Sequence, residues 1–109
     1  MLEVMNLVSN ASGRATVNQF DICRRDESGV AVERVFQSYK SPCAKLERSG
    51  AGKWERLTIY EKGFYSRTTA KWLRVWLEMW LPMEDVPSIL KAAREAVWDG
   101  PADCYTVEF

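Results

Sequence analysis

The chain has 109 residues, of which 47% are apolar and 28% are charged, and its formal net charge is zero. These values are typical of one folded domain and exclude an intrinsically disordered chain. No apolar run approaches the roughly 20 residues of a membrane-spanning helix. Residues 1–9 lack the basic and apolar segments of a secretory signal. We therefore expect a soluble protein of the cytoplasm.

Histidine is absent from the sequence, which excludes several classes of catalytic and metal site. A Ser-His-Asp triad, a Cys-His protease site and a His-containing zinc site all require this residue. The three cysteines, Cys23, Cys43 and Cys104, are widely spaced and form no Cys-x-x-Cys pair. A site of three cysteines and a carboxylate is the alternative to three reduced thiols, and the spacing favours reduced thiols. We predict no metal, no cofactor and no enzymatic activity.

The first 61 residues are predicted to form an antiparallel β-meander of about four to five strands. The alternation of apolar and polar residues indicates strands or extended segments at residues 2–8, 16–23, 30–39, 43–48 and 54–61.

Turn residues separate these segments. Ser28-Gly29 and the Gly-containing stretch 49–53 predict hairpin turns. The apolar period slips between Val32 and Val35, which predicts a bulge near Glu33-Arg34. Lys40-Ser41-Pro42 predicts a break, because proline cannot donate to a strand ladder.

Two helices are predicted after the strands. The first runs from about Arg67 to Leu81, with Ser66 or Thr68 as its cap and Pro82 as its stop. The second begins near residues 84–85 and ends at residues 99–101. Residues 102–109 are either a last edge strand or a tail.

Strands followed by helices define an α+β fold, an antiparallel β-meander with two C-terminal helices packed on one face. We expect one domain over residues 1–109. Residues 1–81 form the meander and the first helix, and residues 82–109 form a helical extension and a tail.

The first predicted helix carries Trp72, Trp76 and Trp80 at four-residue spacing and is apolar over most of its circumference. Such a helix has two surfaces to bury. One surface is expected to cover the sheet. The other is expected to pack on the second helix, on a second copy of the chain in a homodimer, or on a partner.

Charge is uneven along the chain. Residues 1–33 carry a net charge of −2, residues 34–74 carry +7, and residues 75–109 carry −5. Two interpretations follow: a molecule with a basic and an acidic region, or solvated faces that neutralise one another after folding.

Two stretches of the sequence resemble a group of small uncharacterised proteins that are common in phages and mobile elements. The stretches are Phe36-Gln-Ser-Tyr-Lys-Ser-Pro-Cys-Ala-Lys45 and Tyr65-Ser-Arg-Thr-Thr-Ala-Lys71. The resemblance covers residues 6–81. It implies a compact meander ending in the Tyr-Ser-x-Thr-Thr-x-Lys turn and a helix, and an accessory role in the cytoplasm of a host bacterium. No established reaction accompanies it, so no catalytic residue is transferred.

Our leading hypothesis is a non-enzymatic protein that binds and inhibits a host protein complex. Its most concrete form is an anti-CRISPR-type inhibitor, by analogy with small phage proteins that present carboxylates where a nucleic-acid backbone would lie. The residues expected on this acidic face are Glu78, Glu84, Asp85, Glu95, Asp99 and Asp103.

The alternative hypothesis is a non-specific nucleic-acid-binding protein that uses the basic central segment. Basic groups pair with phosphates and aromatic rings stack on bases. Against it, the sequence pI is about 6.3, below that of a typical dedicated binding domain. The residues expected at this site are Tyr39, Lys40, Lys45, Tyr65, Arg67, Lys71 and Arg74.

Overall fold

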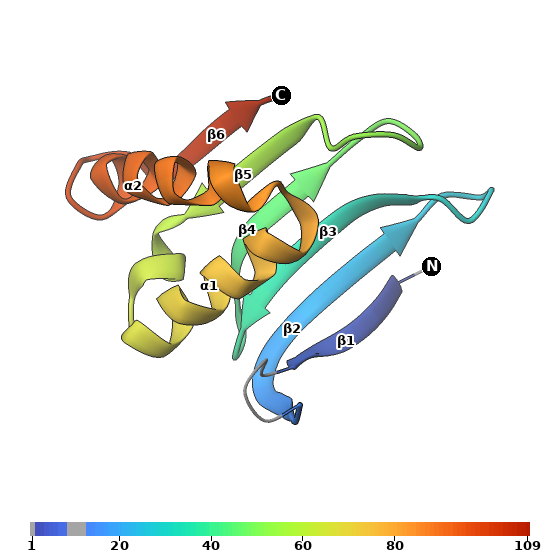
Figure 1. Ribbon diagram of the computed structural model, residues 1–109, viewed down its shortest axis with the longest axis horizontal. Coiled ribbons are helices and arrows are strands. Elements are labelled where there is room, and N and C mark those ends of the chain that lie inside the picture. The colour runs from blue at the N-terminus through green and yellow to red at the C-terminus, as the bar shows by residue number, and fades with distance from the viewer. Residues whose placement is uncertain (1, 9–12) are drawn as a thin grey trace.

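Six antiparallel strands form one sheet in the computed structural model, which describes residues 2–8 and 13–109 (Figure 1). Each strand pairs with its neighbours in sequence, so the order in space is β1-β2-β3-β4-β5-β6. The predicted α+β fold class is therefore confirmed, with slightly more strands than expected. The strands are β1 (Leu2–Val8), β2 (Ala15–Arg25), β3 (Ala31–Ser38), β4 (Ser41–Glu47), β5 (Arg56–Tyr60) and β6 (Cys104–Glu108).

Two α-helices and two short 3-10 helices lie between β5 and β6. They are η1 (Glu61–Phe64), α1 (Arg67–Trp80), η2 (Met83–Asp85) and α2 (Val86–Val97). Helix α1 starts where the capping signal predicts, because the Ser66 side chain accepts a hydrogen bond from the Thr69 backbone N–H. None of the helices in the described residues is long and apolar enough to cross a membrane.

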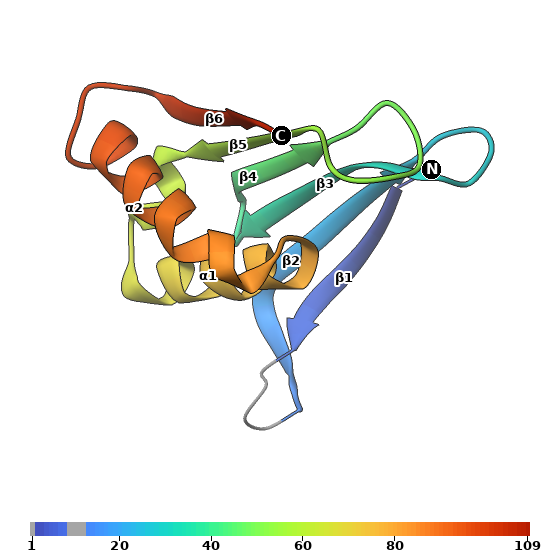
Figure 2. The same ribbon diagram turned by 45° about the horizontal axis from the view of Figure 1, so that its top comes forward.

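Both α-helices cover the same face of the sheet, as Figure 2 shows. Trp72 and Trp76 of α1 are buried against the strands, and Trp76 stacks on Phe36 of β3 with ring centroids 6.1 Å apart. Val86, Ile89, Ala93 and Val97 of α2 join the same core. A homodimer formed through α1 would therefore use side chains other than these two tryptophans.

Over the opposite face of the sheet, no helix is formed by the described part of the chain (Figure 2). An antiparallel sheet tolerates this arrangement when the uncovered face is partly polar. At the β4–β5 end that face carries Lys45 and Thr58, which are directly paired across the two strands. At the β1–β2 end it is apolar, with Val4 opposite Ile22.

The strand boundaries near Pro42 differ from the sequence prediction. Pro42 does not break the strand but lies inside β4, opposite Gln37. The pairing of β3 with β4 shifts at this point, because Phe36 faces Ala44 and leaves Cys43 as an extra residue. A bulge of this kind accommodates proline, which has no N–H to donate. The chain therefore turns within Tyr39 and Lys40 alone.

The bulge predicted near Glu33-Arg34 lies next to that position. Arg24 of β2 faces Glu33, and the next residue, Arg25, faces Ala31, so Val32 is the extra residue. The C-terminal residues 104–108 form β6, which pairs with β5 from Arg56–Glu108 to Tyr60–Cys104. The tail alternative for these residues is therefore excluded.

Candidate functional site

The two motifs that carry the family resemblance meet in space. The Ser38 hydroxyl at the end of β3 lies 3.0 Å from the Thr69 hydroxyl in the first turn of α1. Ser66, the residue that caps α1, donates its hydroxyl to Thr69 Oγ1 at 3.1 Å. Three hydroxyl groups thus tie the β3–β4 turn to the start of α1.

A hollow of about 200 Å³ lies beside these hydroxyls, between the Tyr39 turn and the start of α1. Tyr39 has a positive φ of 56°, an uncommon conformation for an aromatic residue, and its backbone N–H bonds Asn18 O at 2.6 Å. Tyr65 donates its hydroxyl to Glu61, which raises the pKa of Tyr65, and Lys62 lies over its ring. The hollow is thus lined by hydroxyls, two exposed tyrosines and one lysine.

A buried charged network lies under the opposite end of α1. Asp21 of β2 is fully buried, accepts a hydrogen bond from the Trp76 indole at 2.8 Å and forms an ion pair with Arg34 at 2.5 Å. The Arg34 guanidinium in turn lies 3.6 Å from the centroid of the Trp80 ring. The network connects β2, β3 and α1, and the burial of its carboxylate removes it from contact with a ligand.

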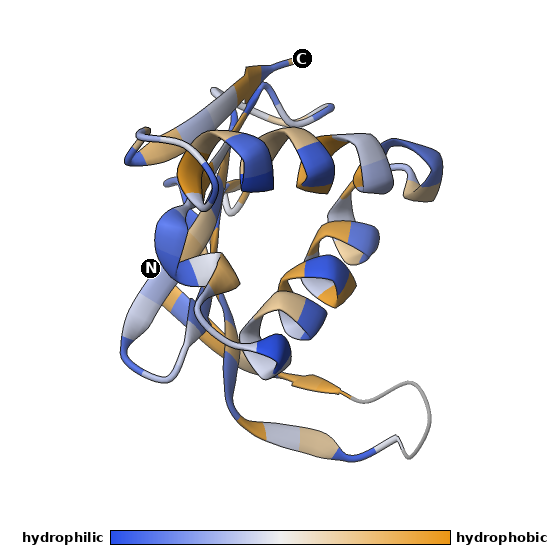
Figure 3. Ribbon diagram, turned by 90° about the vertical axis from the view of Figure 1, so that its left-hand side faces the viewer, coloured by the Kyte–Doolittle hydropathy of each residue, from blue (hydrophilic) through white to orange (hydrophobic). Residues whose placement is uncertain are grey.

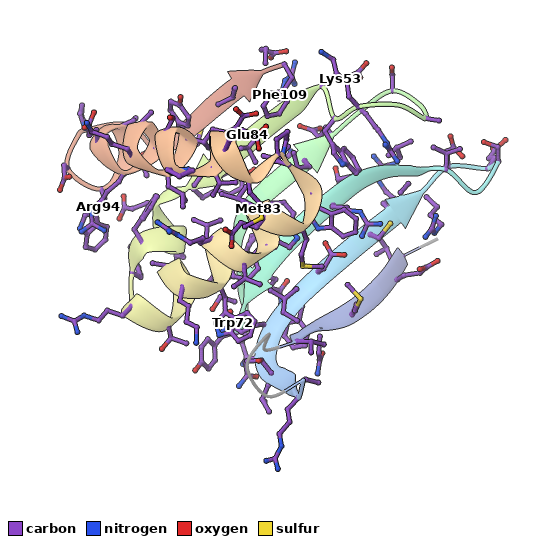
Figure 4. All side chains as sticks on the ribbon, viewed as in Figure 1. Lys53, Trp72, Met83, Glu84, Arg94 and Phe109 are labelled. Atoms are coloured by element: carbon purple, nitrogen blue, oxygen red, sulfur yellow. The ribbon has the colours of Figure 1, made fainter. Side chains whose placement is uncertain are left out.

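A groove of about 390 Å³ opens between β1, α1 and η2, and we call it the β1 groove. Its walls include three methionines, Met5, Met79 and Met83, whose exposed fractions are 44%, 42% and 63%. Val75 and Glu78 of α1 also line it. Methionine is flexible and polarizable, which suits a surface that adapts to a bound side chain. Figure 4 shows Met83 and Glu84 together on the turn that joins the two helices.

The predicted acidic residues separate into two groups along α2. Glu78, Glu84 and Asp85 lie at the β1 groove or on the adjoining η2, whereas Glu95, Asp99 and Asp103 lie at or beyond the opposite end of the helix. A helix of this length separates its ends by about 18 Å. Two acidic clusters therefore replace the single acidic face that we expected.

The predicted basic and aromatic residues are divided in the same way. Tyr39 and Tyr65 come together at the hydroxyl-lined hollow, and Lys40 is at the adjoining turn. Lys45 lies apart from them on the uncovered sheet face, where it pairs with Glu47 at 3.6 Å. The others, Arg67, Lys71 and Arg74, follow the exposed side of α1.

Sequence reasoning missed the methionines of the β1 groove. Met5 and Met79 are far apart in the chain, and no spacing rule connects an edge strand to the end of a helix. It also left Lys91 and Arg94 of α2 outside the basic site, although the structure brings both to the same hollow as Arg74. Their 3.6-residue periodicity, opposite the apolar stripe of α2, is the available signal.

The cysteines show no sign of a shared role. Cys23 and Cys43 are buried, Cys104 is exposed, and all three are free thiols. Over residues 2–8 and 13–109, no three cysteine or carboxylate side chains lie close enough to hold a metal ion.

The fold and these surfaces define a small α+β domain with a one-sided helical layer and open grooves. Residues 3–90 match a family of unknown function, DUF8033, and the chain belongs to this family. The match continues through η2 into α2, past the residues that carry the resemblance described above. No curated protein matches the chain. No solved structure matches it either.

Proposed function

We propose that this protein is a non-enzymatic binding module that holds an extended, basic segment of a partner protein along β1. The observation that carries the proposal is the combination of an open strand edge with the β1 groove beside it. The edge offers backbone hydrogen bonds and the groove offers contacts for alternate side chains, the two elements of recognition by strand addition.

Strand β1 is one of the two edges of the sheet, and in the described residues it pairs only with β2. Five of its seven residues in succession, Leu2–Asn6, are exposed. A long, exposed edge strand with apolar side chains is a site of unwanted pairing unless something covers it. A partner strand on this edge would satisfy the unpaired backbone groups and shield those side chains.

The side chains of the β1 groove determine which residue types the partner strand should carry. Met5, Met79 and Met83 fit apolar side chains that point under α1. Glu78 lines the groove, Glu84 and Asp85 follow Met83, and none of these three carboxylates forms an ion pair with a described residue. Unpaired carboxylates beside an apolar groove favour lysine or arginine next to the apolar residues of the partner.

The resemblance to phage and mobile-element proteins supports a host protein complex as the source of this segment. Inhibition then follows from occupancy, because a complex that donates a strand to β1 loses that strand for its own contacts. An anti-CRISPR-type inhibitor remains the most concrete form of the proposal. A strain with an active CRISPR system tests it: expression of the protein should restore transformation by a targeted plasmid. Transformation that stays blocked would contradict this form.

Selection from a displayed random library of about ten-residue peptides tests the docking itself. We expect enriched sequences with apolar residues at alternate positions and flanking lysine or arginine. The variant M79D/M83D should lose these peptides, because both exposed side chains line the β1 groove. The control V17D/F109D changes exposed apolar residues elsewhere and should retain them.

Two outcomes contradict the docking proposal. One is enrichment that is equal on the wild-type protein and on M79D/M83D. The other is a helical pattern of apolar residues at every third and fourth position, which would indicate a helix in the groove. Sedimentation of the protein alone tests whether a second copy of the chain occupies β1. A concentration-dependent dimer that M79D/M83D abolishes would show that it does.

A further inference from the structure

A second groove, between α1 and α2, collects positive charge. It encloses about 360 Å³ and is lined by Arg74 of α1 and by Lys91 and Arg94 of α2. We call it the helix groove. Figure 3 views the molecule from the side on which the two helices diverge from their connecting turn, and hydrophilic residues recur along both.

The three cations of the helix groove have no oppositely charged partner among the described residues. The side chains of Arg74, Lys91 and Arg94 form no ion pair and no hydrogen bond with any residue in ranges 2–8 and 13–109. No carboxylate is among the described residues that line the groove. Like charges around one hollow repel each other, so an anion in the groove would relieve a cost that the folded chain carries alone.

Apolar and aromatic side chains lie in the helix groove and next to it in the chain. Phe64 and Leu90 line it together with the cations. Trp98 lies one helical turn beyond Arg94 and stacks edge-on against Tyr65 at 5.7 Å between ring centroids. These two rings are 41% and 56% exposed, so the pair presents aromatic surface to solvent beside the cations.

We infer that the helix groove binds the backbone of a single-stranded nucleic acid, with bases on the Tyr65–Trp98 pair. Cations track phosphates and exposed rings stack on bases in proteins that bind single strands. A duplex keeps its bases stacked inside and cannot use the rings. The site is separate from the β1 groove, so tests of nucleic-acid binding and of peptide docking can succeed or fail independently. Of the basic site expected from sequence it contains Tyr65 and Arg74, and it leaves out Tyr39, Lys40, Lys45, Arg67 and Lys71.

Fluorescence anisotropy with a labelled oligothymidine of about twelve nucleotides tests this site. We expect binding by the wild-type protein that weakens as salt rises from about 50 mM to about 200 mM. The variant R74Q/K91Q/R94Q should bind about tenfold more weakly and show a salt slope smaller by about two. The matched variant K40Q/K45Q/K53Q removes the same charge outside the groove, and Figure 4 shows Lys53 far from Arg94. It should bind like the wild type.

Three results would overturn the inference. The first is no binding of the oligothymidine at the lower salt concentration. The second is an equal loss in the two triple variants, which would indicate a response to net charge alone. The third is equal affinity for an abasic strand of the same length, which would leave the Tyr65–Trp98 pair without a role. Thermal unfolding of each variant confirms that the comparison uses folded protein.

Discussion

The indole N–H of Trp76 lies 2.8 Å from the Asp21 carboxylate, 55 residues earlier in the chain, and both side chains are buried. The same carboxylate pairs with Arg34 of the neighbouring strand. One acidic group therefore fixes the helix to two strands in the centre of the fold. Its removal takes away the hydrogen-bond acceptor of both the indole and the guanidinium.

We predict that Asp21→Ala lowers the free energy of unfolding by about 3–5 kcal/mol, because it leaves a largely buried charge uncompensated. Urea denaturation followed by tryptophan fluorescence measures the change. Glu108→Ala is the control, since it breaks the exposed pair with Arg56 and should lower the free energy of unfolding far less. Similar losses in the two variants would contradict the structural role of Asp21.

The hydroxyl network between the two motifs gives a second prediction. Thr69→Val keeps the shape of the side chain but removes the hydroxyl that Ser38 and Ser66 contact, so unfolding should become easier by about 1–2 kcal/mol. Thr68→Val is the matched control at an exposed neighbouring position. In a double-mutant cycle with Ser38→Ala, the two losses should not add. Strict additivity would show that the hydroxyls do not interact.

The two acidic clusters should differ in their effect on peptide binding at the β1 groove. The variant E78Q/E84Q/D85N should weaken binding of a selected basic peptide by about tenfold, because it removes the carboxylates nearest the groove. Titration calorimetry gives the affinity. The variant E95Q/D99N/D103N makes the same change in net charge at the other end of α2. Equal weakening by both would place the peptide elsewhere.

The thiols should react at very different rates. Cys104 is exposed, whereas burial holds the pKa of the Cys43 thiol above its ordinary value. A chromogenic disulfide reagent should therefore label Cys104 rapidly and Cys43 only after unfolding. The serine variant of Cys104 should abolish the fast phase. A fast phase that persists in this variant would show that a buried thiol is accessible.

Because its pKa is raised, Cys43 also makes the free energy of unfolding depend on pH. The neutral thiol is favoured in the folded chain, so the contribution of Cys43 is complete below the pKa of the unfolded thiol, about 8.5. It is lost as the pH rises through the higher pKa of the folded thiol. We predict that urea stability falls above about pH 8.5 and that Cys43→Ala makes this fall shallower. If Cys43→Ala and the wild-type protein showed the same pH dependence, the fall in stability could not be assigned to Cys43.

Local signals predicted the helices well. Ser66 supplies a hydroxyl for the free N–H groups at the start of α1. Pro82 directly follows Leu81, the C-cap residue of α1. Both boundaries therefore depend on residues that are close in the sequence. Pro42 shows the limit of such rules. Its missing N–H forbids a regular ladder, but the extra residue Cys43 on the same strand creates a bulge that accepts it.

The basic block at residues 34–74 is divided between surfaces of the fold, for a reason of geometry. Successive residues of a strand point to opposite faces, so a basic strand segment contributes to two surfaces. Arg34 is drawn inward to Asp21, while Lys45 points to the uncovered face. The two grooves depend on contacts between elements that no local pattern encodes, such as Met5 of an edge strand beside Met79 of a helix.

The last strand, β6, has a consequence for synthesis. It follows both helices in the chain but pairs with β5, the strand that carries the buried side chains Leu57 and Ile59. Until residues 104–108 have left the ribosome, β5 is exposed along one edge beneath a helical layer that has already been made. The sheet is therefore complete only after both helices have been made, and until then β5, in place of β6, is the open edge opposite β1.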